Sequence, residues 1–173
     1  MKILFLDFDG VLNSTRTSIA FANIKGYGTG SLSFSTDSRY PTEFSKEYFR
    51  LDPIAIELLR RVIEDTGAKI VISSTWRLGS CVEHFNKLFE CYGWDTTDIV
   101  IGMTPYFGKI RGDEVKQWLD ENKALGITHY VIVDDSSDFR PEQKPHFVQT
   151  NLNIGFSHVT YNQCLKILGV NSI

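Results

Sequence analysis

The sequence predicts a three-layer α/β fold in which helices cover both faces of a parallel β-sheet. Short apolar runs that suit buried strands alternate with longer segments of helical periodicity through most of the chain. Clusters of acidic, hydroxyl or basic residues follow several of these runs or stand at helix entrances. Parallel sheets bind ligands at the carboxyl ends of their strands. The 173 residues fit a single domain, residues 1–173, with one small insert.

The expected strands are short and apolar, as is typical of strands buried on both faces. We expect them at residues 3–6, 69–73, 98–101, 128–133 and 146–149. Helices are expected at residues 53–66, 78–92, 114–123 and 160–168. The first helix has the clearest boundaries, because Asp52 and Pro53 suit its N-cap and first position and Gly67 suits its end. Its expected apolar face consists of Ile54, Ile56, Leu58, Leu59, Val62 and Ile63.

An insert of approximately residues 13–50 follows the first expected strand and is rich in Ser, Thr, Gly and aromatic residues. It shows no sustained helical period, and such long segments within compact domains are usually functional lids or small inserts. We interpret it as a small cap or flap. Four aromatic residues in it could stack on a base or sugar, or could build a core for the cap: Phe21, Tyr27, Phe34 and Tyr40.

Two acidic residues, Asp7 and Asp9, follow the first expected strand and precede Gly10. Carboxylates at the end of a buried strand are costly unless their charge is compensated. Mg²⁺ prefers oxygen ligands and is therefore a suitable compensating ion. For this pattern taken alone, an ordinary turn in which one Asp caps a helix is the alternative.

Hydroxyl and basic residues stand at two later helix entrances. Ser73 and Ser74 follow the second expected strand, where a hydroxyl and backbone N–H groups can bind phosphate or simply cap a helix. Arg77, just beyond them, could pair with phosphate or a carboxylate, but a surface position is the commoner outcome. Lys109 and Arg111 precede the helix expected at residues 114–123, and either cation could neutralise a bound phosphate.

A second acidic pair, Asp134 and Asp135, ends the strand expected at residues 128–133. Adjacent carboxylates in this position again indicate metal coordination. Asp138, three residues beyond Asp135, suits either the same role or the cap of a turn.

Taken in order, these four clusters resemble the motifs of the haloacid dehalogenase-like (HAD-like) superfamily of phosphohydrolases, spread from Leu4 to Asp138. The Trp-Arg sequence at residues 76–77, the Arg-Gly-Asp-Glu sequence at residues 111–114 and the late acidic pair are similar to a small-capped branch. That branch includes the phosphatase-like domains of RNA repair proteins. The resemblance implies a Rossmann-like HAD fold with a cap after the first strand, and Mg²⁺ as cofactor.

The resemblance also implies roles for the matching residues. Asp7 matches the nucleophile that forms an aspartyl-phosphate, and Asp9 matches the general acid and base. Ser74 is the better match to the phosphate-binding hydroxyl, with Ser73 as the alternative. The superfamily normally has Lys in its third motif, so either Lys109 or Arg111 could take that role. The implied metal ligands are Asp7, Asp9, Asp134 and Asp135.

The expected function is Mg²⁺-dependent hydrolysis of phosphate monoesters. A non-catalytic metal-binding interaction module is one alternative, and a polynucleotide-end phosphatase is a more specific form of the enzyme. A response-regulator receiver domain is disfavoured, because its acidic pair follows the first strand whereas the pair here comes late. The expected partner is a phosphorylated metabolite, nucleotide or polynucleotide end, although a net charge of −3 gives no overall attraction to nucleic acid.

Three widely spaced cysteines suggest reduced thiols, and the sequence has neither a signal peptide nor a run of apolar residues long enough for a membrane helix. We therefore expect a cytoplasmic protein without a membrane partner.

Overall fold

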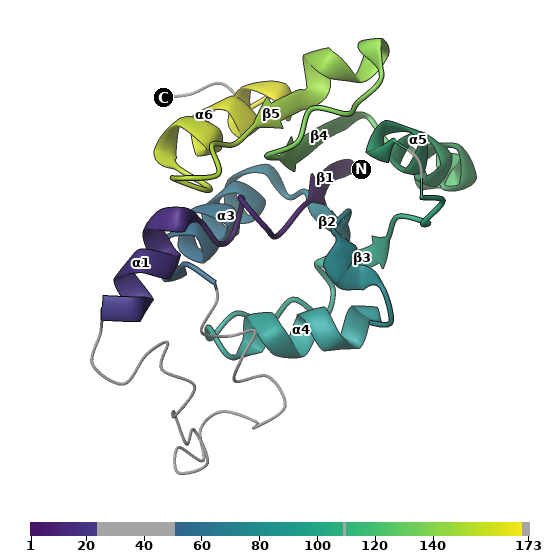
Figure 1. Ribbon diagram of the computed structural model, residues 1–173. Coiled ribbons are helices and arrows are strands. Elements are labelled where there is room, and N and C mark those ends of the chain that lie inside the picture. Colours follow the sequence, from purple (N-terminus) through teal and green to yellow (C-terminus); the bar gives the residue numbers. More distant parts are fainter. Residues whose placement is uncertain (24–50, 109, 171–173) are drawn as a thin grey trace.

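The computed structural model describes residues 1–23, 51–108 and 110–170, and in this part of the chain five strands form one parallel sheet (Figure 1). Their order across the sheet is β3-β2-β1-β4-β5, so the first strand of the chain lies at the centre. The strands are β1 (Lys2–Leu6), β2 (Lys69–Ile72), β3 (Val100–Met103), β4 (His129–Asp134) and β5 (Phe147–Gln149). The predicted α/β fold with a parallel sheet is confirmed.

Helices cover both faces of this sheet. They are α1 (Thr15–Asn23), α3 (Pro53–Thr66), α4 (Val82–Glu90), α5 (Arg111–Glu121) and α6 (His158–Ile167). Leu4 and Leu6 of β1 belong to a core that includes residues of α3, α4 and α6. Ile3 and Phe5 point to the other face, where they pack in a second core with residues of α5. The alternation of side chains along β1 therefore produces the three layers.

Helix α3 begins and ends as the sequence predicts. The Asp52 carboxylate accepts the N–H of Ile54 at 2.9 Å, and Gly67 ends the helix with a positive φ of 66°. The prediction is wrong for one residue of the apolar face, because Ile54 is 64% exposed. Ala55, one helical step of about 100° further on, is buried instead and lies on the same face as Leu59.

Several predicted boundaries are shifted, and three of the starts have a clear physical reason. Helix α4 begins at Val82 rather than residue 78, because Thr75–Arg77 forms a separate 3₁₀ turn and Gly79 has a φ of 78°. Strand β3 begins at Val100, since a turn that closes on the carbonyl of Thr96 occupies the preceding residues. Helix α5 begins at Arg111 rather than 114, where the Asp138 carboxylate accepts the N–H of Arg111 at 3.0 Å. Asp138 therefore caps this helix.

Of the predicted insert, the structure describes only residues 13–23, which contain α1. The rest of the predicted cap lies outside the described residues, as do Tyr27, Phe34, Tyr40 and the side chain of Phe21. Among the helices that are described, none is both long and apolar enough to span a membrane.

Hydrogen bonds of the sheet continue past the ends of the strands and bring the predicted site residues to one edge. The N–H of Asp7 donates to the carbonyl of Val133 at 3.1 Å, and the N–H of Ser73 donates to the carbonyl of Leu6 at 2.8 Å. The residues that follow β1 and β2 are thus held beside the end of β4, which finishes in Asp134.

Candidate active site

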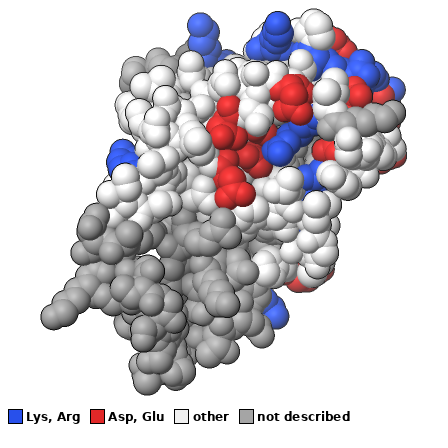
Figure 2. All heavy atoms as spheres, in the orientation of Figure 1, with Lys and Arg blue, Asp and Glu red and all other residues white. Residues whose placement is uncertain are grey.

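Three carboxylates meet at the carboxyl ends of β1 and β4. Asp7, Asp134 and Asp135 each offer an oxygen, and these oxygens lie within 4.8 Å of one another. Acidic side chains gather beside basic ones on the face shown in Figure 2. The fourth predicted ligand, Asp9, is turned elsewhere: its carboxylate accepts hydrogen bonds from Trp76 and Asn13. Three of the four predicted metal ligands therefore form one cluster, and the assignment of Asp9 as a ligand stays a prediction.

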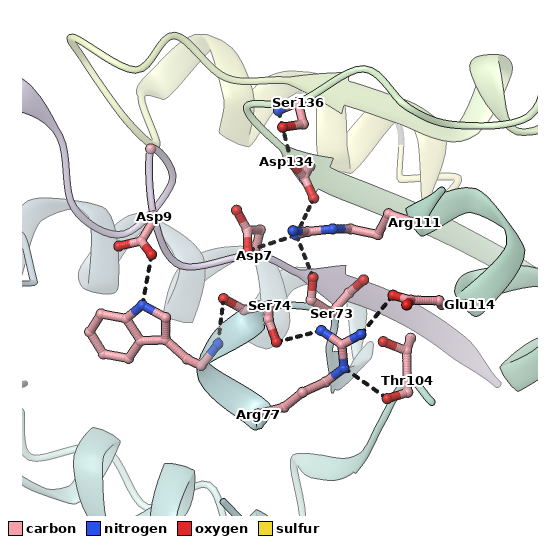
Figure 3. Close-up of polar contacts among 12 residues, drawn as sticks. Asp7, Asp9, Ser73, Ser74, Arg77, Thr104, Arg111, Glu114, Asp134 and Ser136 are labelled. Carbon is pink, nitrogen blue, oxygen red and sulfur yellow. Dashed lines mark hydrogen bonds and ion pairs between the residues drawn. The ribbon is translucent and has the colours of Figure 1, made fainter. Parts of the chain in front are cut away.

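Arg111 at the start of α5 is the cation of this cluster (Figure 3). Its Nη1 lies 2.8 Å from Oδ1 of Asp7 and 2.7 Å from Oδ2 of Asp134. The same nitrogen donates to the backbone carbonyl of Ser73 at 2.6 Å. Lys109, the other predicted candidate, lies outside the described residues. Arg111 thus joins the ends of three strands.

One arginine does not balance three carboxylates. Burial raises the pKa of Asp7 above its ordinary value, although Arg111 and Ser74 act in the opposite direction. Burial and the neighbouring Asp7 raise the pKa of Asp134 to about 8, against the lowering effect of Arg111. Both shifts have the same cause, which is negative charge held in a poorly solvated position. A further cation would relieve it.

The two serines after β2 have different surroundings. Ser74 is fully buried, and its hydroxyl accepts the N–H of Trp76 at 3.3 Å. A side-chain hydrogen bond with Ser74 also lowers the pKa of Asp7, so this hydroxyl faces the predicted nucleophile. The buried hydroxyl of Ser73 has no hydrogen-bond partner among the described residues. Ser73 contributes its carbonyl to Arg111 instead.

Arg77 forms a buried ion pair beside the cluster. Its Nη2 lies 2.6 Å from Oε2 of Glu114, and the side chains are only 3% and 4% exposed. Of the outcomes considered for Arg77, the carboxylate pairing is the one found, and the favoured surface position is wrong. The guanidinium of Arg77 also donates to the carbonyls of Ser74 and Thr104 (Figure 3), and to that of Pro105. Arg77 therefore fastens the loop after β2 to α5 and does not contact the carboxylate cluster. Glu114 lies four residues before Trp118, so the two share one side of α5, and both are buried. This helical spacing was the one signal in the sequence that indicated burial of Glu114.

Two glycines allow close approaches around the site. A Cβ at Gly10, whose φ is 72°, would lie 2.5 Å from Cγ of Asp135. A Cβ at Gly112 would lie 2.5 Å from Oε1 of Gln143 and 2.8 Å from the backbone nitrogen of Arg140. Both positions require a residue without a side chain, one so that the acidic loops can meet and the other so that α5 can pack against the segment after β4.

Comparison with known proteins gives one match. A family model described as the HAD domain in Swiss Army Knife RNA repair proteins matches residues 3–160. The match covers β1 from Ile3 onward, the acidic cluster, both serines and Arg111. Searches of curated proteins and of solved structures found no match to the chain.

Proposed function

The chain belongs to the family of HAD domains found in Swiss Army Knife RNA repair proteins, and we propose that it is a Mg²⁺-dependent phosphohydrolase that cleaves phosphate monoesters. The observation that carries this proposal is the position of Asp7. Its carboxylate lies in a cluster of three buried or half-buried acids, in contact with one arginine and one serine hydroxyl. This surrounding suits a carboxylate that attacks phosphorus while its charge is compensated by cations.

The cluster fits a magnesium ion in chemistry and in charge. Asp7, Asp134 and Asp135 offer hard oxygen ligands that converge within 4.8 Å. The raised pKa values of Asp7 and Asp134 indicate an excess of buried negative charge that a divalent cation would compensate. When bound there, Mg²⁺ would lower the repulsion between the nucleophile and a phosphate dianion and would hold the phosphate in line.

In the first step, an Asp7 oxygen forms a bond to phosphorus and the bond between phosphorus and the ester oxygen breaks. Asp9 gives its proton to the departing alkoxide, which leaves as the alcohol. Ser74 and Arg111 would bind the phosphate oxygens, because both already contact Asp7. The product of this step is an aspartyl-phosphate on Asp7.

In the second step, Asp9 takes a proton from water and the water oxygen attacks phosphorus. The bond between phosphorus and Asp7 then breaks, which releases inorganic phosphate and restores the carboxylate. Asp9 has thus returned the proton it gave, and the cycle is balanced. An acceptor other than water would give phosphotransfer, but a residue able to deprotonate water, the role proposed for Asp9, favours hydrolysis.

Phosphorylated RNA ends are the first substrates to test, because the family is described from RNA repair proteins. Nucleotides, sugar phosphates and p-nitrophenyl phosphate complete the comparison. With Mg²⁺ we expect release of inorganic phosphate from at least one of them, and a phosphoprotein that hydroxylamine cleaves, as expected for an acyl phosphate. Asp7→Asn should abolish both signals. Asp98→Asn is the control, because Asp98 is exposed and is not one of the proposed site residues, and it should retain both signals.

Two results would contradict the proposal. Full activity of Asp7→Asn would show that another residue attacks phosphorus. A folded protein that binds Mg²⁺ but hydrolyses none of the substrates would favour the non-catalytic interaction module.

A further inference from the structure

Both oxygens of the Asp9 carboxylate accept hydrogen bonds from neutral donors. The indole Nε1 of Trp76 donates to Oδ2 at 2.9 Å, and Nδ2 of Asn13 donates to Oδ1 at 2.7 Å. The orientation of the Asn13 amide follows from its other contact, because its Oδ1 accepts the N–H of Gly10 at 2.9 Å. Figure 3 shows the indole contact, and together the two donors, which lie on different segments, set the direction of one carboxylate.

The indole of Trp76 is itself held in place. Its ring stacks on Phe8, with centroids 4.9 Å apart and planes at 24°. Phe8 is fully buried and packs against Phe85 and Phe89 of α4. Phe8 therefore supports the indole of Trp76, and this packing directs the indole N–H toward Asp9.

Asp9 also lines a pocket of about 340 Å³ next to the start of α1. The other lining residues are mostly small and polar, and include Asn13, Ser14 and Ser18, together with Leu152. A leaving group that enters this pocket would lie beside Asp9, the residue that must protonate it. The direction of the Asp9 carboxylate then decides whether the proton reaches the leaving oxygen.

We propose that Trp76 and Asn13 are positioning residues that hold the Asp9 carboxylate toward the leaving oxygen, an inference that rests on the proposed phosphohydrolase function. An aspartate side chain has two free torsions, and without these donors its carboxylate would distribute over several rotamers. A general acid acts only within hydrogen-bond reach of the atom that it protonates. Loss of either donor should therefore slow the steps that need a proton and spare those that do not.

Leaving groups of different basicity separate these steps. A p-nitrophenolate departs without a proton, whereas the alkoxide of glycerol 2-phosphate requires one. The value of kcat/KM reports the steps up to departure of the alcohol and excludes later hydrolysis of the aspartyl-phosphate. We expect Trp76→Phe, which keeps a ring on Phe8 but loses the N–H, to lower kcat/KM roughly tenfold for glycerol 2-phosphate and less than about twofold for p-nitrophenyl phosphate. Asn13→Leu should behave in the same way.

Two further variants complete the comparison. Trp94→Phe is the matched control, because Trp94 packs against Phe89 of the same core cluster that the half-buried Trp76 contacts, but lies outside the proposed site. It should leave the ratio of the two kcat/KM values unchanged. Asp9→Asn should show the largest selective loss, because a general acid contributes about 10²–10⁴-fold.

The outcomes distinguish the inference from the function on which it rests. If Asp9→Asn loses activity selectively and neither Trp76→Phe nor Asn13→Leu does, positioning by these residues is overturned and the phosphohydrolase stands. If Asp9→Asn affects both substrates equally, Asp9 is not the acid, and the assignment of Asp9 and the inference fall together.

A measurement on the protein without substrate tests the contact itself. In ¹⁵N–¹H spectra the indole signal of Trp76 is identified by its loss in Trp76→Phe. Asp9→Ala should move this signal upfield and speed its exchange with water, while the Trp94 signal stays in place. An unmoved Trp76 signal would overturn the inference whatever the activity.

Discussion

Replacing Glu114 with glutamine should destabilise the protein strongly, although the two side chains have almost the same shape. Glu114 is the only carboxylate that the structure pairs with Arg77 among the described residues, at 2.6 Å. Its second oxygen accepts the N–H of Phe107 at 3.0 Å. If the single amide oxygen of glutamine keeps the bond from Phe107, its NH₂ group faces the guanidinium, so the substitution removes both the charge and the acceptor that Glu114 offers Arg77.

The magnitude follows from burial. Side-chain exposures of 3% and 4% mean that water cannot replace the lost partner of Arg77. Removing one partner of a buried ion pair typically costs about 3–5 kcal/mol. The carbonyls of Ser74, Thr104 and Pro105 still accept from the guanidinium, which favours the lower end of about 3 kcal/mol. Arg77→Met should cost a similar amount, because it leaves the Glu114 charge buried.

Urea unfolding followed by circular dichroism measures these losses, and a double-mutant cycle separates the pair from its surroundings. The combination of Arg77→Met with Glu114→Gln should cost less than the sum of the single changes, by about 2 kcal/mol. Glu57→Gln is the matched control, because it breaks an ion pair of 3.1 Å with Arg61 whose side chains are 53% and 61% exposed. It should cost below about 0.5 kcal/mol. A Glu114→Gln loss no larger than that of the control, or strict additivity in the cycle, would refute the reasoning.

Two other predictions concern the acidic cluster. Burial and Asp7 raise the pKa of Asp134 to about 8, so the folded protein holds this proton more tightly than the unfolded chain, and metal-free stability should fall as pH rises between about 4 and 8. Asp134→Asn removes this dependence: without metal its melting temperature should exceed that of the wild type by more at about pH 8 than at about pH 5, and equal gains would contradict the argument. Gly10→Ala should displace Asp135 and abolish the rise in melting temperature on adding Mg²⁺, because the new Cβ would lie 2.5 Å from Cγ of Asp135. Gly79→Ala, at a similar φ of 78° with nothing within 4 Å, should lose about 1 kcal/mol of stability and keep the Mg²⁺ response, so a Gly10→Ala protein that keeps it too would refute the close-approach argument.

Sequence reasoning predicted the sheet and α3 because their signals are local. A buried strand reads as an apolar run whatever lies around it, and Asp52, Pro53 and Gly67 define the ends of α3 by their own backbone preferences. The start of α5 has no such signal. Its cap comes from Asp138, which is 27 residues away in sequence, so the predicted start at residue 114 was three residues late.

The same distinction holds for the site. Asp7 follows β1 and Asp134 ends β4, and the ends of parallel strands meet at one edge, so their proximity was predictable. The surroundings of the two serine hydroxyls were not predictable. Ser73 and Ser74 are adjacent, and the direction of each hydroxyl depends on how the chain turns after β2. The buried pairing of Arg77 was equally hidden, since its partner lies on a helix whose start was misplaced.

The start of α5 decides more of the site than any single strand does. Because successive helical residues point about 100° apart, neighbours at the first turn face different parts of the molecule. Arg111 faces the acidic cluster, Gly112 lies against the segment after β4, and Glu114 reaches Arg77 on the loop after β2. A helix that began three residues later would leave Arg111 in a loop and would place no fixed cation beside Asp7. The Arg-Gly-Asp-Glu sequence therefore acts as one unit, in which the helix start positions Arg111 beside Asp7 while Glu114 secures the loop that carries Ser74.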